Sequence, residues 1–216
     1  MPRPPKKRPA SPRTRSPASP TAAAEPSPLR IVGGTMWGRK IAYSGDERTR
    51  PMKDRVREAV FNLVGPAVKG THAIDLFAGT GALGFEALSR GASRATFLEQ
   101  HFPTARLIEQ NARQLGVKDQ CRVVPGDVFA WGRRGPALDE DPARPPWLAF
   151  CSPPFVFYAE RKADMLELLA VVLKSAPPGS ICVIEADTKF DFASLPDPAA
   201  WQVRHYPPAV VGILRT

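Results

Sequence analysis

Three glycines after a short apolar run have the spacing of a nucleoside-binding loop. Residues 75–84 read DLFAGTGALG, in which Gly79, Gly81 and Gly84 match G-x-G-x-x-G. Between a strand and a helix, such glycines allow a tight turn and a close approach of the backbone to a ligand. Glu99 ends the next strand-like run, where a carboxylate can accept hydrogen bonds from ribose hydroxyls. The spacing predicts a nucleotide-type site, with a solvated Glu99 as the alternative.

The carboxylate of Asp75 favours a cationic cofactor over a phosphorylated one. A pyrophosphate at a helix N-terminus is negatively charged, and Asp75 would bring a second anion to the same crevice. S-Adenosylmethionine carries a sulfonium and an amino group and has no phosphate. Asp127 could accept from its adenine amino group, with Val128 as an apolar contact, or Asp127 could cap a helix. A nicotinamide-dependent oxidoreductase is the alternative that the glycines alone would allow.

A stiff turn at the end of another strand could hold a flat base. The apolar run 147–151 is followed by Ser152-Pro153-Pro154-Phe155. The prolines restrict the backbone, and the phenylalanine ring can stack on a base. Ser152 offers acceptor lone pairs, but its side chain is short and uncharged. Glu185, on a later strand, could supply a compensating carboxylate or could be a surface charge.

Alternating strands and helices must position these residues. Apolar spacing predicts helices over 54–64, 80–91, 104–116 and 163–176. It predicts strands, some with their turns, over 29–32, 71–79, 94–100, 121–127, 147–155, 180–187, 201–206 and 209–215. This order indicates an α/β fold with a mainly parallel sheet and helices on both faces. The last two strands have no helix between them and should pair antiparallel.

Composition separates a basic tail from a globular body. The chain has 216 residues and a net charge of +9, which makes nucleic acid the natural partner. Residues 1–28 hold nine prolines and six Lys or Arg, which predicts a disordered arm that either binds phosphates or only aids solubility. The segment 132–146, rich in Gly, Pro and charge, is expected to be a mobile loop, either a gate or an inert insertion.

Sequence features also bear on compartment and metal binding. No apolar run reaches the roughly 18 residues of a membrane span, and the N-terminus has no apolar stretch of the signal-peptide type. We therefore expect a cytoplasmic protein. Cys121, Cys151 and Cys182 match no zinc-binding spacing and are expected to be core thiols, so no metal site is predicted.

Longer stretches of the sequence resemble a known family. DLFAGTGALGFEALSRGA (75–92) resembles the first motif of class I S-adenosylmethionine-dependent methyltransferases, and in detail that of the bacterial 16S rRNA guanine-N2-methyltransferases. RIVGGTMWGRK (30–40) and TRPMKDRVREAVFNLV (49–64) resemble the N-terminal signature of that family. The turn SPPF stands where the family has Asp-Pro-Pro-Phe. The resemblance covers roughly residues 29–216 and is thinner after residue 160.

The resemblance implies a class I methyltransferase (Rossmann-like) fold with seven strands, the C-terminal one antiparallel. It implies methyl transfer from S-adenosylmethionine to the exocyclic N2 amino group of a guanine in small-subunit rRNA, free or in an assembling 30S subunit, by a monomer. Residues 29–216 would form the methyltransferase domain, of which 29–70 would contact RNA or cofactor. The implied cofactor residues are Asp75, Phe77, Gly79, Gly81, Glu99, Gln100, Asp127 and Val128. The implied base-binding residues are Ser152, Pro153, Pro154 and Phe155, and the implied RNA-binding residues are Arg39, Arg50 and Arg55, with Gly33 and Gly34 beside Arg39.

Ser152 departs from the family pattern, in which a carboxylate and the next carbonyl accept the two amino hydrogens and expose the nitrogen lone pair. Three interpretations stay open. The protein turns over with serine and backbone acceptors, it acts on another atom, base or nucleic acid, or it binds cofactor and RNA without chemistry. Arg39 is either a phosphate ligand or a solvated charge.

Overall fold

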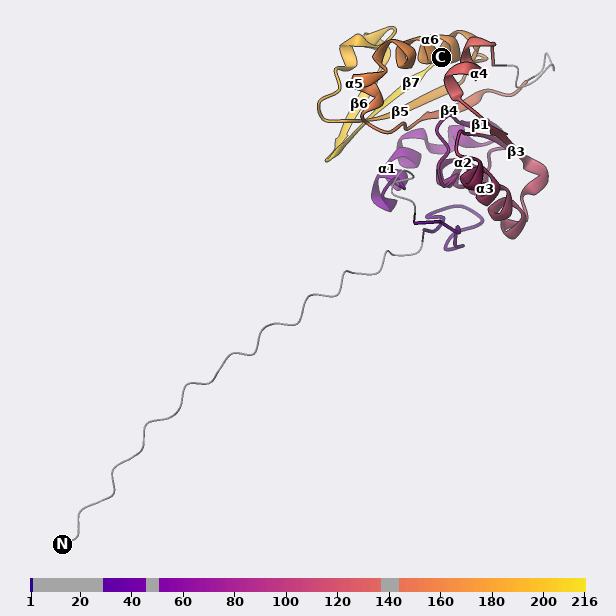
Figure 1. Cartoon of the computed structure of the whole chain (residues 1–216), viewed down its shortest axis with the longest axis vertical. Coiled ribbons are helices and arrows are strands. Elements are labelled where there is room, and N and C mark those ends of the chain that lie inside the picture. Colours follow the sequence, from indigo (N-terminus) through magenta and orange to yellow (C-terminus); the bar gives the residue numbers. More distant parts are fainter. Residues whose placement is uncertain (2–28, 46–50, 137–143) are drawn as a thin grey trace.

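The computed structural model describes residue 1 and residues 29–45, 51–136 and 144–216 (Figure 1). The predicted disordered arm, Arg50 and the middle of the predicted mobile loop therefore lie outside the described residues. The predicted division into a tail, residues 1–28, and a methyltransferase domain, residues 29–216, stays a prediction.

Seven strands form one mainly parallel sheet in the order β3-β2-β1-β4-β5-β7-β6. The strands are β1 (His72–Asp75), β2 (Arg94–Glu99), β3 (Cys121–Pro125), β4 (Trp147–Cys151), β5 (Ile181–Asp187), β6 (Gln202–Tyr206) and β7 (Ala209–Arg215). Strands β1 to β5 pair in parallel, whereas β7 runs antiparallel to both β5 and β6. The predicted parallel sheet and the antiparallel pairing of the last two strands are confirmed.

Helices connect the parallel strands and cover the sheet. They are α1 (Asp54–Val64), α2 (Ala82–Ser89), α3 (Phe102–Leu115), α4 (Val128–Arg133), α5 (Phe157–Glu160) and α6 (Lys162–Ser175). Short 3-10 helices span Gly65–Val68, Lys118–Gln120, Phe192–Ser194 and Pro198–Ala200. The four predicted helices are confirmed within a few residues. The sequence pattern did not show α4 and α5, since six and four residues are too few for a 3.6-residue period to appear.

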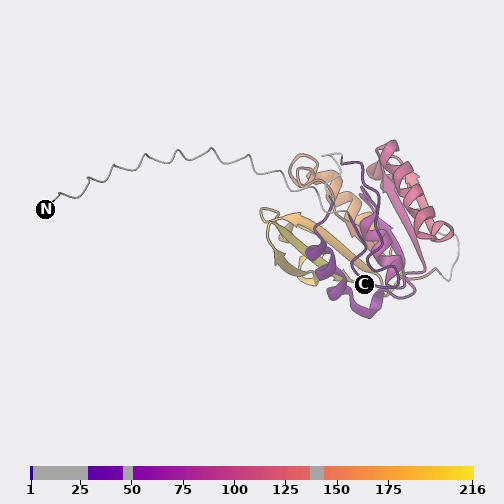
Figure 2. The same cartoon turned by 90° about the horizontal axis from the view of Figure 1, so that it is seen from below.

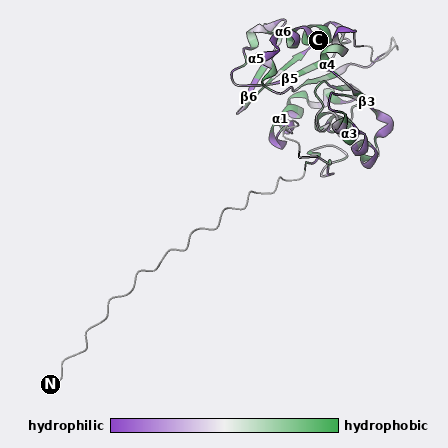
Figure 3. Ribbon diagram, viewed as in Figure 1, coloured by the Kyte–Doolittle hydropathy of each residue, from purple (hydrophilic) through white to green (hydrophobic). Residues whose placement is uncertain are grey.

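The helices form two layers, with α1, α2 and α3 on one face of the sheet and α4, α5 and α6 on the other (Figures 1 and 2). Alternate residues of each strand enter different cores because side chains alternate across a strand. Leu148 and Phe150 of β4 join the core under α1 to α3, whereas Trp147 and Ala149 join the other. The hydropathy colouring shows the apolar strands between more polar outer helix surfaces (Figure 3).

The predicted strand over residues 29–32 is wrong. Arg30 forms only an isolated antiparallel bridge with Lys40. The chain turns back after two residues, and the amide of Ile31 donates to the carbonyl of Arg39 at 3.0 Å. The loop then packs on the end of α2, because a Cβ on Gly34 would lie 2.0 Å from the Ser89 carbonyl oxygen. Close packing on α2 is therefore one reason for glycine at this place, and the predicted phosphate binding by this loop stays a prediction.

A buried ionic network fastens α1 and this loop to α2. The side chains of Arg57 and Glu86 are both fully buried, with 3.6 Å between Nε and Oε2. Glu86 also accepts from Nε of Arg90 at 2.7 Å and from the amide of Val32 at 2.8 Å. Arg57 reaches Asp54 at 2.9 Å. Every carboxylate oxygen of Glu86 is therefore matched by a donor from the chain.

The described residues bear on three features that the sequence analysis considered: the cysteines, metal binding and membrane spans. The three cysteines are free thiols, with Cys151 and Cys182 buried and Cys121 half-buried, in agreement with core thiols. Among the described residues, no group of three metal-binding side chains comes together. In the same part of the chain, no helix has the length and apolar character that crossing a membrane requires.

Candidate active site

The glycine loop joins the end of β1 to the start of α2. Gly81 has φ of 76° and is the residue before the first turn of α2, a conformation that side chains disfavour. A Cβ on Gly84 would lie 2.3 Å from the ring of Phe97 in β2, so glycine is needed for helix-to-strand packing. The turn therefore has the backbone shape that the sequence spacing predicts, at the carboxyl edge of the sheet.

Asp75 lies beneath this loop, with one carboxylate oxygen unpaired in the described structure. The residue ends β1 and is only 1% exposed. Its Oδ2 accepts from the amide of Gly84 at 3.3 Å, and its Oδ1 is buried with no hydrogen-bond partner among the described residues. Burial raises the pKa of Asp75 from 3.8 to about 7, the Gly84 hydrogen bond opposes this, and the charge of Glu99 adds to it. Such a group fits a cationic ligand, which would restore the charge balance.

Glu99 and Gln100 stand at the end of the neighbouring strand β2. Glu99 accepts from the amide of Gly79 at 2.8 Å and from the amide of His101 at 2.7 Å. It is therefore tied to the glycine loop and is not merely solvated. Each oxygen keeps a lone pair for a ribose hydroxyl. Gln100 is exposed next to it.

Asp127 and Val128 begin the helix after β3. The carboxylate of Asp127 accepts from the amide of Phe129 at 3.0 Å, so it caps the N-terminus of α4, which was one of the two predicted roles. Asp127 is exposed and Val128 is buried. The cap orients the carboxylate, and Val128 offers an apolar surface next to it.

An aromatic cluster adjoins the glycine loop on the α4–α5 side of the sheet. Phe77 is half-buried, and its ring centroid lies 5.8 Å from that of Phe129 and 6.2 Å from that of Phe157. The guanidinium of Arg161 lies 3.8 Å from the Phe129 ring centroid. The sequence analysis named Phe77 alone. Its partners were missed because they come from the two short helices, α4 and α5.

The turn after β4 exposes its apolar residues unevenly. Pro153 is buried, Pro154 is exposed, and Phe155 is half-buried against the core under α1 to α3. The amide of Phe157 donates to the carbonyl of Pro154 at 2.9 Å, which starts α5. The structure thus holds Phe155 firmly at the carboxyl edge of the sheet.

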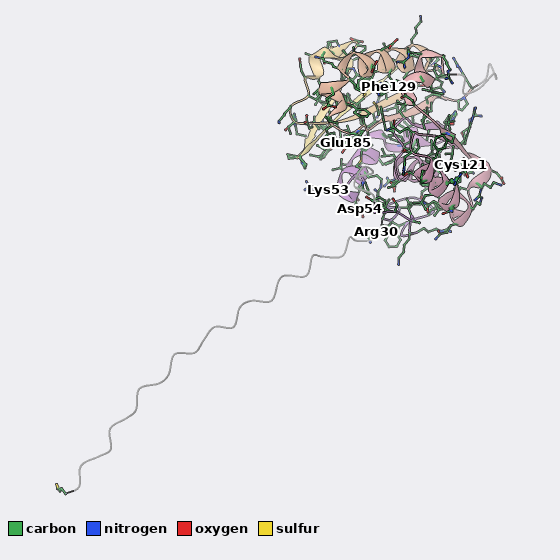
Figure 4. All side chains as sticks on the ribbon, in the orientation of Figure 1. Arg30, Lys53, Asp54, Cys121, Phe129 and Glu185 are labelled. Carbon is green, nitrogen blue, oxygen red and sulfur yellow. The ribbon has the colours of Figure 1, made fainter. Side chains whose placement is uncertain are left out.

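Ser152 and Glu185 form a hydrogen-bonded pair at this edge. The last residues paired between β4 and β5 include Cys151 with Ile184, so Ser152 and Glu185 are the next positions in register. The hydroxyl of Ser152 donates to the carboxylate of Glu185. Glu185 is 9% exposed, and burial raises its pKa while the Ser152 hydrogen bond opposes the shift. Glu185 is therefore not the surface charge that was one of its two predicted roles. It lies between α5 and α1 in Figure 4.

The structure separates the predicted RNA-binding arginines. Arg39 is exposed and donates to the carbonyls of Gln114 at 2.5 Å and Leu115 at 2.8 Å, so it caps the C-terminus of α3. Its contact with RNA phosphates stays a prediction. Arg55 is exposed on α1 and donates to the carbonyl of Pro207 at 2.5 Å. That turn precedes β7 and lies at the carboxyl edge of the sheet, since Ala209 pairs with Asp187 at the end of β5.

The strand order, the reversed β7 and the glycine loop after β1 define the class I S-adenosylmethionine-dependent methyltransferase fold. Within this class, the chain belongs to the family described as conserved hypothetical protein 95, whose model matches residues 29–204.

Individual relatives agree with this assignment. Over 142 residues, the chain is 35% identical to the ribosomal RNA small subunit methyltransferase D of Haemophilus influenzae, which covers 64% of this chain and 69% of that protein. The Escherichia coli protein yhhF superposes with a TM-score of 0.68 at 27% identity, covering 88% of this chain and 98% of that one. The RNA methyltransferase of Salinibacter ruber, solved with S-adenosyl-L-homocysteine, shares the fold (TM-score 0.55, 18% identity, 77% and 93% covered). The chain spans 54%, 69% and 60% of the first three curated relatives it matches.

Proposed function

We propose that this protein transfers a methyl group from S-adenosylmethionine to the N2 amino group of a guanine in small-subunit rRNA. One observation carries the proposal. The glycine loop, the buried Asp75 and the Ser152–Phe155 turn all lie at the carboxyl edge of adjacent strands β1 and β4. The relatives named for small-subunit rRNA methylation support the substrate.

The residues at this edge fit the cofactor. Bound there, S-adenosylmethionine would supply an activated methyl group on a sulfonium. Asp75 would face its positive charge, since one buried oxygen of this carboxylate lacks a partner among the described residues. Glu99 would accept from the ribose hydroxyls, and Asp127 with Val128 would hold the adenine. Phe77, Gly79, Gly81 and Gln100 would form the wall around it.

The turn after β4 would hold the target base. Phe155 would stack on the guanine, which must leave its own stack to reach the pocket. Acceptors around Ser152 and the Pro153 carbonyl would bind the amino hydrogens and direct the nitrogen lone pair towards the methyl group. Positioning of this kind supplies much of the acceleration when the donor is already activated.

Basic residues near the same edge would bind RNA phosphates. Arg55 is exposed and lies against the turn before β7, at the carboxyl end of β5. Lys53, two positions earlier, is also exposed. Because phosphate contacts dominate the affinity of such complexes, we expect their loss to weaken RNA binding and to reduce its dependence on salt. We further propose that the protein acts as a monomer on an rRNA or 30S substrate in the cytoplasm.

The function is tested by giving the purified protein methyl-labelled S-adenosylmethionine with unmethylated small ribosomal subunits, naked rRNA or duplex DNA. Digestion of the RNA to nucleosides should then yield labelled N2-methylguanosine, with DNA unlabelled. Label on DNA or on another nucleoside would contradict the proposed substrate. Cofactor binding with no label on any substrate would favour a binding protein without turnover, the alternative to which the serine at 152 points.

A further inference from the structure

The side chain of Ser152 is fixed by a partner on the neighbouring strand. Its hydroxyl donates to the carboxylate of Glu185. The pair arises from strand register, because the parallel strands β4 and β5 place these two positions next to each other. Tyr158 of α5 braces the arrangement, since its hydroxyl donates to the backbone carbonyl of Glu185 at 3.0 Å.

This hydrogen bond decides what Ser152 can offer to a ligand. A hydroxyl has a single proton and two acceptor lone pairs. With the proton directed to Glu185, the oxygen of Ser152 can only accept from a further group. A neighbouring carboxylate also makes that oxygen a stronger acceptor, because hydrogen bonds in a chain polarise one another. An amino group of a base is such a donor.

Glu185 has no competing cation among the described residues. Its side chain is nearly buried, and no described lysine or arginine forms an ion pair with it. Burial raises its pKa, which makes the carboxylate a better base than an exposed one. Buried carboxylates without a cation are uncommon unless a function requires them.

Accordingly, and resting on the function proposed above, we propose that Ser152 and Glu185 together do what a single carboxylate at position 152 does in the family pattern. Ser152 is the catalytic residue that accepts the amino hydrogen, and Glu185 is the positioning residue that acts through it.

The pair also accounts for the proton released in the reaction. As the bond from N2 to the methyl carbon forms and the bond from that carbon to sulfur breaks, N2 acquires a positive charge. N2 then gives one proton to Oγ of Ser152, while Oγ passes its own proton to Oε2 of Glu185. The nitrogen ends neutral and methylated, and the carboxyl group ends protonated.

Four variants test the pair: Ser152→Ala, Glu185→Gln, the double variant Ser152→Ala with Glu185→Gln, and the double variant Ser152→Asp with Glu185→Gln. Asp187→Asn is the matched control, because Asp187 lies on the same strand and is half-exposed, and its carboxylate accepts, within the described part of the chain, only from the amide of Lys189. For each variant, kcat and KM are measured on unmethylated small ribosomal subunits, together with S-adenosylmethionine affinity and the unfolding transition.

Each single variant should lose about 100-fold in kcat, in the range of a general base, with cofactor affinity unchanged. Ser152→Ala with Glu185→Gln should be no worse than either single variant, since the two residues act as a unit. Ser152→Asp with Glu185→Gln should recover to within about tenfold of the unmodified protein, because it returns one carboxylate to the site.

Other outcomes separate the two proposals. If the unmodified protein methylates guanine N2 and the Glu185→Gln variant has the same kcat, the pair is overturned but the proposed function is not. Loss of activity in Glu185→Gln with no recovery in the double variant carrying Ser152→Asp would mean that Glu185 is only structural. Activity confined to that double variant would show that the pair does not replace the aspartate. No activity in any protein would overturn both proposals.

Discussion

Buried carboxylates occur in two regions of this molecule, and the two regions give them different partners. Under the N-terminal loop, Glu86 is fully buried between Arg57 and Arg90. Its oxygens accept from Arg90 and from a backbone amide, and Arg57 forms an ion pair with it. At the carboxyl edge of the sheet, Asp75 is 1% exposed and Glu185 is 9% exposed, and no described lysine or arginine forms an ion pair with either.

The difference distinguishes a structural charge from a functional one. Burying a carboxylate costs free energy that a paired cation and hydrogen bonds offset. Around Glu86 the chain supplies these partners itself. At the sheet edge the described residues compensate the burial less completely, as the raised pKa values of Asp75 and Glu185 show, and we propose that a ligand completes it.

The largest effect should come from removing the cation Arg57 from the network around Glu86. Arg57→Met should lower the free energy of unfolding by about 3–5 kcal/mol, since a buried carboxylate would lose a partner. Arg30→Ala removes an exposed ion pair to Asp54 and should cost less than about 1 kcal/mol. Urea denaturation measures both values. A loss below about 1 kcal/mol in Arg57→Met would show that the network is not what holds α1.

Removing the charge of Asp75 should change the free energy of unfolding in the opposite direction. Asp75→Asn should stabilise the ligand-free protein by up to about 4 kcal/mol, the equivalent of a pKa raised from 3.8 to about 7. The unfolded carboxyl ionises near pH 4, whereas the folded one holds its proton up to about pH 7. The destabilisation caused by the buried charge of Asp75 therefore grows from pH 4 to pH 7 and is constant above pH 7.

The extra stability of Asp75→Asn over the unmodified protein should accordingly be complete at pH 8 and absent near pH 4. Urea denaturation of both proteins at pH 8, 6 and 4.5 checks this trend. An advantage that does not change with pH would assign the effect to packing instead of charge.

Smaller effects are expected from two arginines, Arg39 in the N-terminal loop and Arg55 near the candidate site. Arg39→Met removes two hydrogen bonds to the last carbonyls of α3 and should cost about 1–2 kcal/mol of stability. Its affinity for small-subunit rRNA should equal that of the unmodified protein. Arg55→Met should do the reverse, with weaker RNA binding and little change in stability. Equal loss of RNA affinity in both variants would return Arg39 to the RNA-binding surface.

The sequence was informative where one residue type has one geometric use. The glycines at 79, 81 and 84 predicted the turn and the helix after β1, and the alternation of apolar runs predicted the sheet. It was uninformative where a role depends on a partner far along the chain. The capping role of Arg39 was missed because its partners, at the end of α3, are remote in sequence.

The same reason applies at the candidate site. The sequence raised Glu185 as a compensating carboxylate, but the hydrogen bond from Ser152 depends on the register of β4 with β5, which only the fold supplies. Tyr158 carried no sequence signal, because its helix α5 has only four residues. Asp127 had two predicted roles, and its bond to the Phe129 amide became visible only with the short helix α4.

The central claim is that Asp75, a buried carboxylate with one oxygen unpartnered among the described residues, binds the positively charged cofactor. It is tested most directly by calorimetric titration with S-adenosylmethionine between pH 5.5 and 8.5. The unmodified protein should bind about tenfold more tightly per pH unit up to about pH 7, where Asp75 loses its proton, and level off above. Asp75→Asn should bind at least tenfold more weakly at pH 8 and show no such slope. Equal affinity of the two proteins at pH 8 would contradict the account.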